Sequence, residues 1–311
     1  MRQHGTPGRP DALTLDTPDV LAPPGTLPEP VALDAPAREP VVVGVDGSAL
    51  SLVAVRLAAR EAARHRRALR IVHCFNWEPD PRVDPTTDLR QPAEEVIAQA
   101  VATGSEEAPQ VPVAGAIVEG PALTTLLRES GDAALLAIGD GGLPERVCVP
   151  LDATALQIAA RAGCSVLVAR EHTRPTGQIL VGVDGSETCQ AALELAFDTA
   201  AWRDAELVVV QAWDPDARPP GGEAHLAARF DAALEPMRRR YPTVRVTPRV
   251  LPGEPKDVLV EQSRTAELAV ASARGEQPWR GMLGAVSQAL LYHSPAPVLI
   301  VRGPHEVYVQ E

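Results

Sequence analysis

The chain has 311 residues, of which 45% are hydrophobic, 23% are charged and only 3% are aromatic. The length is enough for about two domains. The proportions are typical of a soluble globular protein, with a core made mostly of Ala, Val and Leu. The formal net charge of -12 argues against nucleic acid as a general partner, because an acidic chain repels phosphate backbones.

No apolar run approaches the roughly 18–20 residues that span a bilayer, and the N-terminus lacks the apolar stretch of a signal peptide. We therefore expect a cytoplasmic protein that does not bind membranes. The four cysteines are Cys74, Cys148, Cys164 and Cys189. None of them is in a CxxC pair, and none is at the spacing of a zinc site. This arrangement predicts reduced thiols in a reducing compartment.

Residues 1–38 are rich in proline and carry no hydrophobic period. Proline removes a backbone donor and disfavours helix at the residue before it, so this segment is predicted to be a disordered tail. The rest of the chain divides into a first domain at 39–172 and a second at 176–303, followed by a short tail at 304–311.

An internal repeat is the strongest feature of the sequence. The letters VGVDGS at 43–48 return unchanged at 181–186, and the landmarks that follow keep the same order in both copies. The copies close on similar apolar runs at 166–170 and 298–302. A shared order over such a length indicates internal duplication and predicts two domains of one fold.

Each copy is predicted to alternate strands with helices. The predicted strands are short, nearly continuous apolar runs, as expected for strands covered on both faces. They lie at 41–46, 69–75, 111–118, 133–139 and 165–170, and at 178–184, 205–212, 243–251, 266–272 and 297–302. Ser48 and Ser186 are suitable N-caps for the first helix of each copy.

The alternation of β and α predicts an α/β fold with a parallel sheet and right-handed crossovers. Such sheets bind ligands beyond the carboxyl ends of their strands, where the strand order reverses. Periodicity does not fix the strand order, so a flavodoxin-like or receiver order remains an alternative at this point.

An Asp-Gly-Ser sequence ends the first strand of each copy and supplies the first candidate site. Asp46 and Gly47 stand there in the first copy, and Asp184 and Gly185 in the second. An Asp at this place points toward the ligand crevice, so it is a candidate contact for a nucleotide or a metal. The alternative interpretation is an Asx-type turn that leads into the helix.

The second candidate site is the loop after the fourth strand. In the first copy it contains Gly139 and Gly142. In the second copy the corresponding stretch contains Ser272, Arg274, Gly275, Gly284, Ala285 and Ser287. A glycine-rich loop that leads to a helix N-terminus presents backbone N–H groups to a phosphate.

The VGVDGS start, this loop and the ending SPAPVLIVR at 294–302 together resemble the universal stress protein family, over nearly all of 40–303. The resemblance implies two tandem, open, Rossmann-like sheets of five parallel strands, of the adenine nucleotide α-hydrolase-like type. It also implies pairing of the domains and, in some members, ATP binding through a Gly-x2-Gly-x9-Gly-Ser/Thr loop.

The first copy departs from that loop at its end. Gly139 and Gly142 match the first two glycines, but Asp152 takes the third glycine position and Ala153 the hydroxyl position. A carboxylate that faces phosphates is unfavourable unless a metal or an arginine neutralises it.

The second copy departs in other ways. Ser272 replaces the first glycine and Ala285 the hydroxyl residue, and the spacing is one residue short. Gly275 and Gly284 remain, and Arg274 is a candidate to offset part of the phosphate charge. Since no acid intrudes, the second copy is the better candidate for a surviving site.

The sequence therefore predicts a stress or regulatory protein that binds an adenine nucleotide, ATP with Mg²⁺, in at most one domain and without efficient catalysis. Asp46 or Asp184 is expected near the ribose or the metal. The two domains are expected to form an intramolecular pseudo-dimer through their last strands, with a homodimer as a further assembly. Two alternatives are a nucleotide-independent protein-interaction module and a weak ATP hydrolase or adenylyl-transfer enzyme.

Overall fold

The structure is a computed structural model, and it describes residues 39–75, 90–141, 153–171, 177–216, 221–273 and 282–302. The tails predicted at 1–38 and 304–311 lie outside these residues. In the described part of the chain, no helix is both long and apolar enough to cross a membrane.

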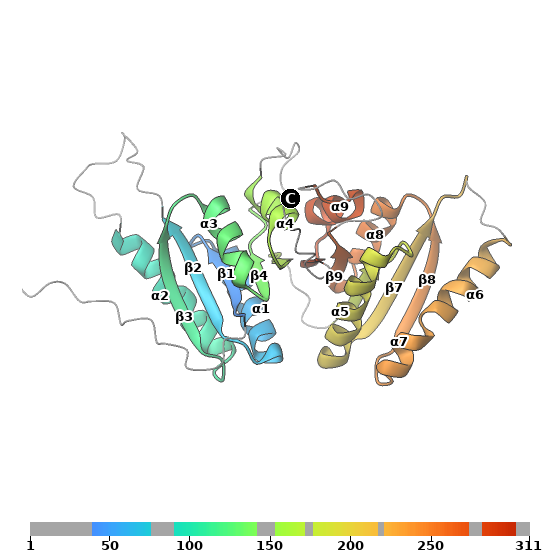
Figure 1. The fold of residues 1–311 in the computed structure, drawn as a ribbon, viewed down its shortest axis with the longest axis horizontal. Helices are drawn as coiled ribbons and strands as arrows, with labels where there is room; N and C mark the ends of the chain where they lie inside the picture. Colours follow the sequence, from blue (N-terminus) through green and yellow to red (C-terminus); the bar gives the residue numbers. More distant parts are fainter. Residues whose placement is uncertain are drawn as a thin grey trace, which may run out of the picture. The chain divides into compact units, whose positions relative to one another are not determined.

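The first repeat alternates strands and helices as the sequence predicts (Figure 1). Its elements are β1 (Val41–Val45), α1 (Ala49–His65), β2 (Leu69–Phe75), α2 (Arg90–Glu107), β3 (Val113–Glu119), α3 (Ala122–Glu129), a short 3-10 helix (Ser130–Asp132), β4 (Leu135–Ile138), α4 (Thr154–Arg161) and β5 (Ser165–Val168).

The second repeat follows the same plan, with one additional short helix. Its elements are β6 (Gln178–Gly182), α5 (Glu187–Arg203), β7 (Glu206–Trp213), α6 (Glu223–Ala233), α7 (Glu235–Arg240), β8 (Val246–Pro252), α8 (Pro255–Ser263), β9 (Ala266–Ser272), α9 (Ala285–His293) and β10 (Val298–Val301). Every predicted strand is present, with boundaries shifted by a few residues.

The strands form one sheet in the order β3-β2-β1-β4-β5-β10-β9-β6-β7-β8. All pairs within a repeat are parallel, whereas β5 and β10 pair antiparallel and join the repeats. Each repeat therefore has its third, second, first, fourth and fifth strands side by side in that order. A flavodoxin-like sheet places its first strand between the second and third, so that alternative is wrong.

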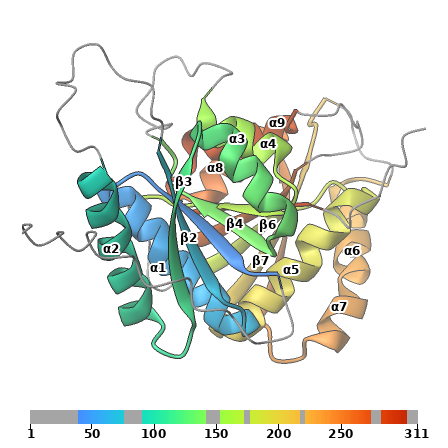
Figure 2. The ribbon, with the colours of Figure 1, turned by 60° about the vertical axis from the view of Figure 1, so that its left-hand side comes forward.

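Helices cover both faces of this sheet. Buried residues of α1, α2, α5, α6 and α7 form one apolar layer, and those of α3, α4, α8 and α9 form the other. Figure 2 shows α1 and α2 on the side of the first repeat opposite α3 and α4. Because helices cover both faces, the central strands are mostly apolar.

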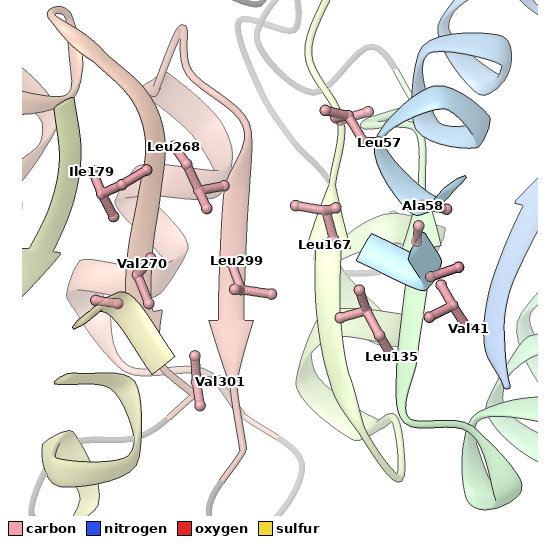
Figure 3. Packing of buried hydrophobic residues seen from close by; sticks show 14 of the residues in the cluster. Val41, Leu57, Ala58, Leu135, Leu167, Ile179, Leu268, Val270, Leu299 and Val301 are labelled. Atoms are coloured by element: carbon pink, nitrogen blue, oxygen red, sulfur yellow. The ribbon is translucent and has the colours of Figure 1, made fainter. Parts of the chain in front are cut away.

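The apolar layer beneath α1 and α5 runs across the junction between the repeats (Figure 3). Leu135 and Leu167 belong to it from the first repeat, and Leu268 and Leu299 from the second. Leu167 in β5 and Leu299 in β10 are direct partners in the ladder. The two repeats thus share a continuous core.

The first helix of each repeat starts as the sequence predicts. Ser48 is the N-cap of α1, and its Oγ accepts a hydrogen bond from the Ser51 N–H at 3.1 Å. Ser186 occupies the N-cap position of α5. An N-cap of this type satisfies one of the N–H groups that have no partner inside the helix.

Candidate functional site

A crevice lies in each repeat beyond the carboxyl ends of its strands, at the point where the strand order reverses. The first crevice, of about 510 Å³, lies between the ends of β1, β2 and β4 and the first turns of α3 and α4. The second crevice, of about 370 Å³, lies between the equivalent elements of the second repeat. Both positions are those expected for a ligand site in an open α/β sheet.

Asp46 lines the first crevice and at the same time forms a turn. Its Oδ1 accepts hydrogen bonds from the Ser48 N–H at 3.0 Å and from the Ser48 hydroxyl at 2.6 Å. Partial burial on its own would raise the pKa of Asp46, but these hydrogen bonds lower it below its ordinary value. Gly47 follows with φ of 84°, a conformation that favours glycine.

Asp184 repeats this geometry in the second crevice. Its Oδ1 accepts from the Ser186 N–H at 3.0 Å and from the Ser186 hydroxyl at 2.6 Å, and Gly185 has φ of 81°. The turn interpretation of the Asp-Gly-Ser sequence is therefore confirmed, and contact of Asp46 or Asp184 with a nucleotide or a metal stays a prediction. One carboxylate oxygen sets the turn, while the residue still faces the crevice.

Some of the candidate residues in the loops after β4 and β9 belong to the described part of the chain, and these residues line the crevices. Gly139 and its neighbour Gly141 line the first crevice, and Ser272 lines the second. Gly142, Arg274 and Gly275 lie outside the described residues, as does Asp152.

The first turn of α9 forms one wall of the second crevice, through Gly284, Ala285 and Ser287. Gly284 is the N-cap, and its N–H donates to the Ala273 carbonyl at 3.1 Å. Ser287 is buried, and its hydroxyl donates to the Ser272 carbonyl at 2.6 Å. The Ser287 hydroxyl therefore ties α9 to the end of β9 and fixes this wall, and the backbone of the first turn of α9 is what the wall presents to a ligand.

Sequence reasoning missed Lys256, which also lines the second crevice. It is the second residue of α8, and it is the only lysine among the 311 residues. The single occurrence was the signal that could have drawn attention to it. Among the described residues that line the first crevice there is no Lys or Arg.

Cys189 is a further lining residue of the second crevice, at the place that Ser51 has in the first. The Cys189 thiol donates to the Ser186 carbonyl at 3.0 Å, and the Ser51 hydroxyl donates to the Ser48 carbonyl at 2.8 Å. Burial raises the pKa of the Cys189 thiol, which keeps it in the protonated, unreactive form at neutral pH.

The described residues contain no group of three or more His, Cys, Asp or Glu side chains that would hold a metal ion by themselves. Asp46 and Asp184 are the acidic side chains that the sequence predicts near a metal, and each already accepts hydrogen bonds with one oxygen. Mg²⁺ commonly takes one or two carboxylates and completes its shell with water and phosphate oxygens. These donors therefore fit a Mg²⁺ that nucleotide phosphates also hold.

Comparison with known proteins agrees with this geometry. The sequence profile described as the Universal stress protein family matches residues 37–170 and again 176–302. Universal stress protein Rv2005c of Mycobacterium tuberculosis is 32% identical over 287 residues, which cover 84% of this chain and 96% of the relative. Universal stress protein Rv2623 of the same organism is 31% identical over 291 residues, with the same coverage.

A solved structure shares the fold over the same extent. The crystal structure of a universal stress protein from Archaeoglobus fulgidus has a TM-score of 0.65 at 15% identity and covers 84% of this chain and 96% of its own. The two matched segments, the relatives that extend over both repeats and the common fold lead to one conclusion: the chain belongs to the universal stress protein family and carries two tandem domains of it.

Proposed function

We propose that this protein is a regulatory universal stress protein of the cytoplasm that binds an adenine nucleotide in its second crevice. The domains are those at 39–172 and 176–303, and they act as an intramolecular pseudo-dimer joined through β5 and β10. ATP with Mg²⁺ is the nucleotide that the loop of the second repeat is expected to take. Binding, and not turnover, is the function.

The observation that carries the proposal is the composition of the second crevice. It brings together a carboxylate at a strand end (Asp184), the open first turn of α9 (Gly284 and Ala285) and a cation (Lys256). Hydroxyl groups of a ribose suit a carboxylate acceptor, and phosphate suits helix N–H groups and an ammonium. The apolar residues Leu259 and Ala271 complete the lining and suit a base.

The first crevice is the weaker candidate for a nucleotide. The described residues that line it include Asp46 but no Lys or Arg, and the sequence places a further acid, Asp152, where binding members of the family have glycine. A polyphosphate there would face like charge without a neutralising group.

Cys189 supports binding rather than catalysis in the second crevice. Its thiol is a hydrogen-bond donor to the Ser186 carbonyl, and burial raises its pKa. A thiol in that state is a poor nucleophile. We therefore expect ATP consumption at a rate equal to that of buffer, and faster turnover would favour the enzymatic alternative.

Calorimetric titration of the nucleotide-stripped protein with Mg-ATP tests the proposal, with Gly284→Asp as the key variant. Gly284 has φ of -64° and ψ of 157°, which any residue adopts, and Asp is a favourable N-cap. The variant is expected to fold and to lose at least about tenfold in affinity, because its carboxylate faces the phosphates. The wild type is expected to bind about one equivalent of nucleotide per chain.

Thr154→Asp is the matched control, because Thr154 is exposed at the first turn of α4 and lines the first crevice. We expect its affinity for ATP to equal that of the wild type. Loss of binding in this variant alone would move the site to the first crevice. No heat and no thermal stabilisation of the wild type at millimolar ATP would favour the nucleotide-independent interaction module.

A further inference from the structure

We propose that Lys256 is the phosphate-contacting residue of the second crevice and that it makes the site select nucleotides over uncharged nucleosides. The inference rests on the proposed function and names the part of the ligand that is recognised. It starts from two independent observations: the chain uses lysine once in 311 residues, and that lysine lines the crevice.

The helix position of Lys256 is unfavourable by itself. Lys256 is the second residue of α8, where the positive end of the helix dipole repels a cation. The neighbouring Glu254 and Asp257 are the residue types that this end of a helix prefers. A residue that opposes a local rule without a structural gain is typical of a functional position.

The first repeat shows that the fold does not require a lysine here. Gly120 and Gly253 precede α3 and α8 with φ of 126° and 130°, so the two turns correspond. Counting three residues on from each glycine places Leu123 where the second repeat has Lys256. Leu123 is partly buried and packs against the apolar layer of α3 and α4, so the same backbone position is apolar in one repeat and carries a charge in the other.

Lys256 forms no ion pair with another residue in the described part of the chain. The salt bridges there join arginine or histidine side chains to carboxylates, and none of them involves Lys256. Lys256 is exposed and lines the same crevice as the N-terminal turn of α9. An ammonium and a helix N-terminus that face one cavity both favour the same class of ligand group, a phosphate.

The acids around the crevice limit the class further. Asp184 and Glu254 line it together with Lys256. The two acids disfavour a carboxylate ligand, and Lys256 disfavours a cation. A sugar that carries phosphate suits this mixed lining better than either. The ribose hydroxyls are expected next to Asp184 and the phosphate next to Lys256.

Calorimetry on Lys256 variants tests the assignment. Lys256→Met removes the charge and leaves an unbranched side chain that is one atom shorter, and Lys256→Arg keeps the charge. We expect Lys256→Met to weaken the binding of ATP and of AMP about tenfold or more and to leave the binding of adenosine unchanged. We expect Lys256→Arg to keep most of the affinity of the wild type for ATP and AMP. Arg264→Met is the control, because it removes an exposed cation at the C-cap of the same helix, α8. We expect it to bind nucleotide like the wild type.

Selective acetylation provides a second readout that does not depend on a variant. With the N-hydroxysuccinimide ester of acetic acid, the deprotonated Lys256 amine forms an amide bond to the acetyl carbon, and the ester bond breaks to release N-hydroxysuccinimide, while the proton passes to buffer. Because the chain has one lysine, mass spectrometry follows this site against the α-amino group as internal reference. We expect ATP and AMP, but not adenosine, to slow acetylation of Lys256 alone.

The outcomes separate the two proposals. Normal nucleotide affinity in Lys256→Met, together with acetylation that nucleotide does not slow, overturns the role of Lys256 and leaves nucleotide binding standing. Equal loss of adenosine and nucleotide affinity in Lys256→Met points to damage to the crevice and overturns the phosphate contact. Absence of nucleotide binding in the wild type overturns the proposed function and this inference together.

Discussion

At the scale of single residues, the polar groups that the sequence singles out have structural partners in the crevices. Asp46 and Asp184 each set a turn with one carboxylate oxygen, and the Ser287 hydroxyl holds the Ser272 carbonyl. These contacts give each crevice its shape. In the second crevice, the backbone at the start of α9 and the side chain of Lys256 also line the cavity, and the first crevice has no lysine or arginine among its described lining residues. The proposed difference in function between the two repeats rests on this difference in lining.

Arg170 is a residue on which folding is expected to depend. Its side chain is only 3% exposed, its Nη1 lies 3.2 Å from Asp140 Oδ2, and its Nε donates to the Ser294 carbonyl at 3.0 Å. It thus joins the loop after β4 of the first repeat to the end of α9 in the second. Arg170→Met removes the guanidinium from a buried carboxylate, and we expect a loss of about 3 kcal/mol in the free energy of unfolding.

Urea denaturation measures this effect, with Arg264→Met as the control. The Arg264 side chain is 61% exposed and pairs with an equally exposed Glu261, so its loss is expected to change stability by at most about 0.5 kcal/mol. An Arg170→Met variant that is as stable as this control would show that the buried pair does not stabilise the junction.

At the scale of elements, the ends of the first helices are expected to be sites of strain. Arg66 is the C-cap of α1 and has φ of 52°, and Asp204 is the C-cap of α5 and has φ of 50°. Both residues are exposed, and glycine is the residue that adopts this left-handed conformation without cost. We expect Arg66→Gly and Asp204→Gly each to raise the free energy of unfolding by about 1 kcal/mol.

Alanine at the same positions separates relief of strain from loss of the side chain. Arg66→Ala and Asp204→Ala remove the same groups and keep a Cβ, so denaturant midpoints close to the wild type are expected for both. Equal stabilisation by alanine and glycine would mean that the side chains, and not the backbone, are unfavourable.

The strands could be predicted from sequence because each is a short apolar run between turn residues, as in Val41–Val45 and Ala266–Ser272. The duplicated motif likewise located Asp46 and Asp184, and both lie in crevices. Strand order depends on contacts between distant segments, so periodicity left it open. Lys256 was missed because it belongs to no motif, and it reaches the site only when α8 packs on β9 and β6.

At the scale of the whole molecule, a charged network joins the repeats on the α1 and α5 side. Glu61 of α1 accepts from Arg203 of α5 at 3.0 Å and from Arg64 at 3.2 Å. Arg64 also bonds to Asp198 at 2.5 Å and to Thr199 at 2.9 Å in α5. The two repeats therefore contact each other through ionic groups as well as through the apolar layer.

Burial on its own would raise the pKa of Glu61, but the hydrogen bond with His65 and the charges of Arg203 and Arg64 lower it from 4.5 to about 2. A folded-state pKa below the unfolded one stabilises the fold above pH 4.5, and that contribution is lost as the pH falls toward 2. A shift of this size corresponds to roughly 3 kcal/mol. Glu61→Gln should therefore be less stable than the wild type at pH 7 by an amount of that order.

The pH dependence distinguishes this ionic contribution from a packing effect. Denaturation curves at several pH values between 7 and 3 are expected to show the deficit of Glu61→Gln shrinking below about pH 4.5, because the wild type then loses what the variant already lacks. Glu235→Gln, whose carboxylate is 52% exposed in a pair with Arg239, is expected to follow the wild type throughout. A Glu61→Gln deficit that is constant over this range would mean that the repeats are joined by packing and the β5–β10 ladder, with no net contribution from the charge of Glu61.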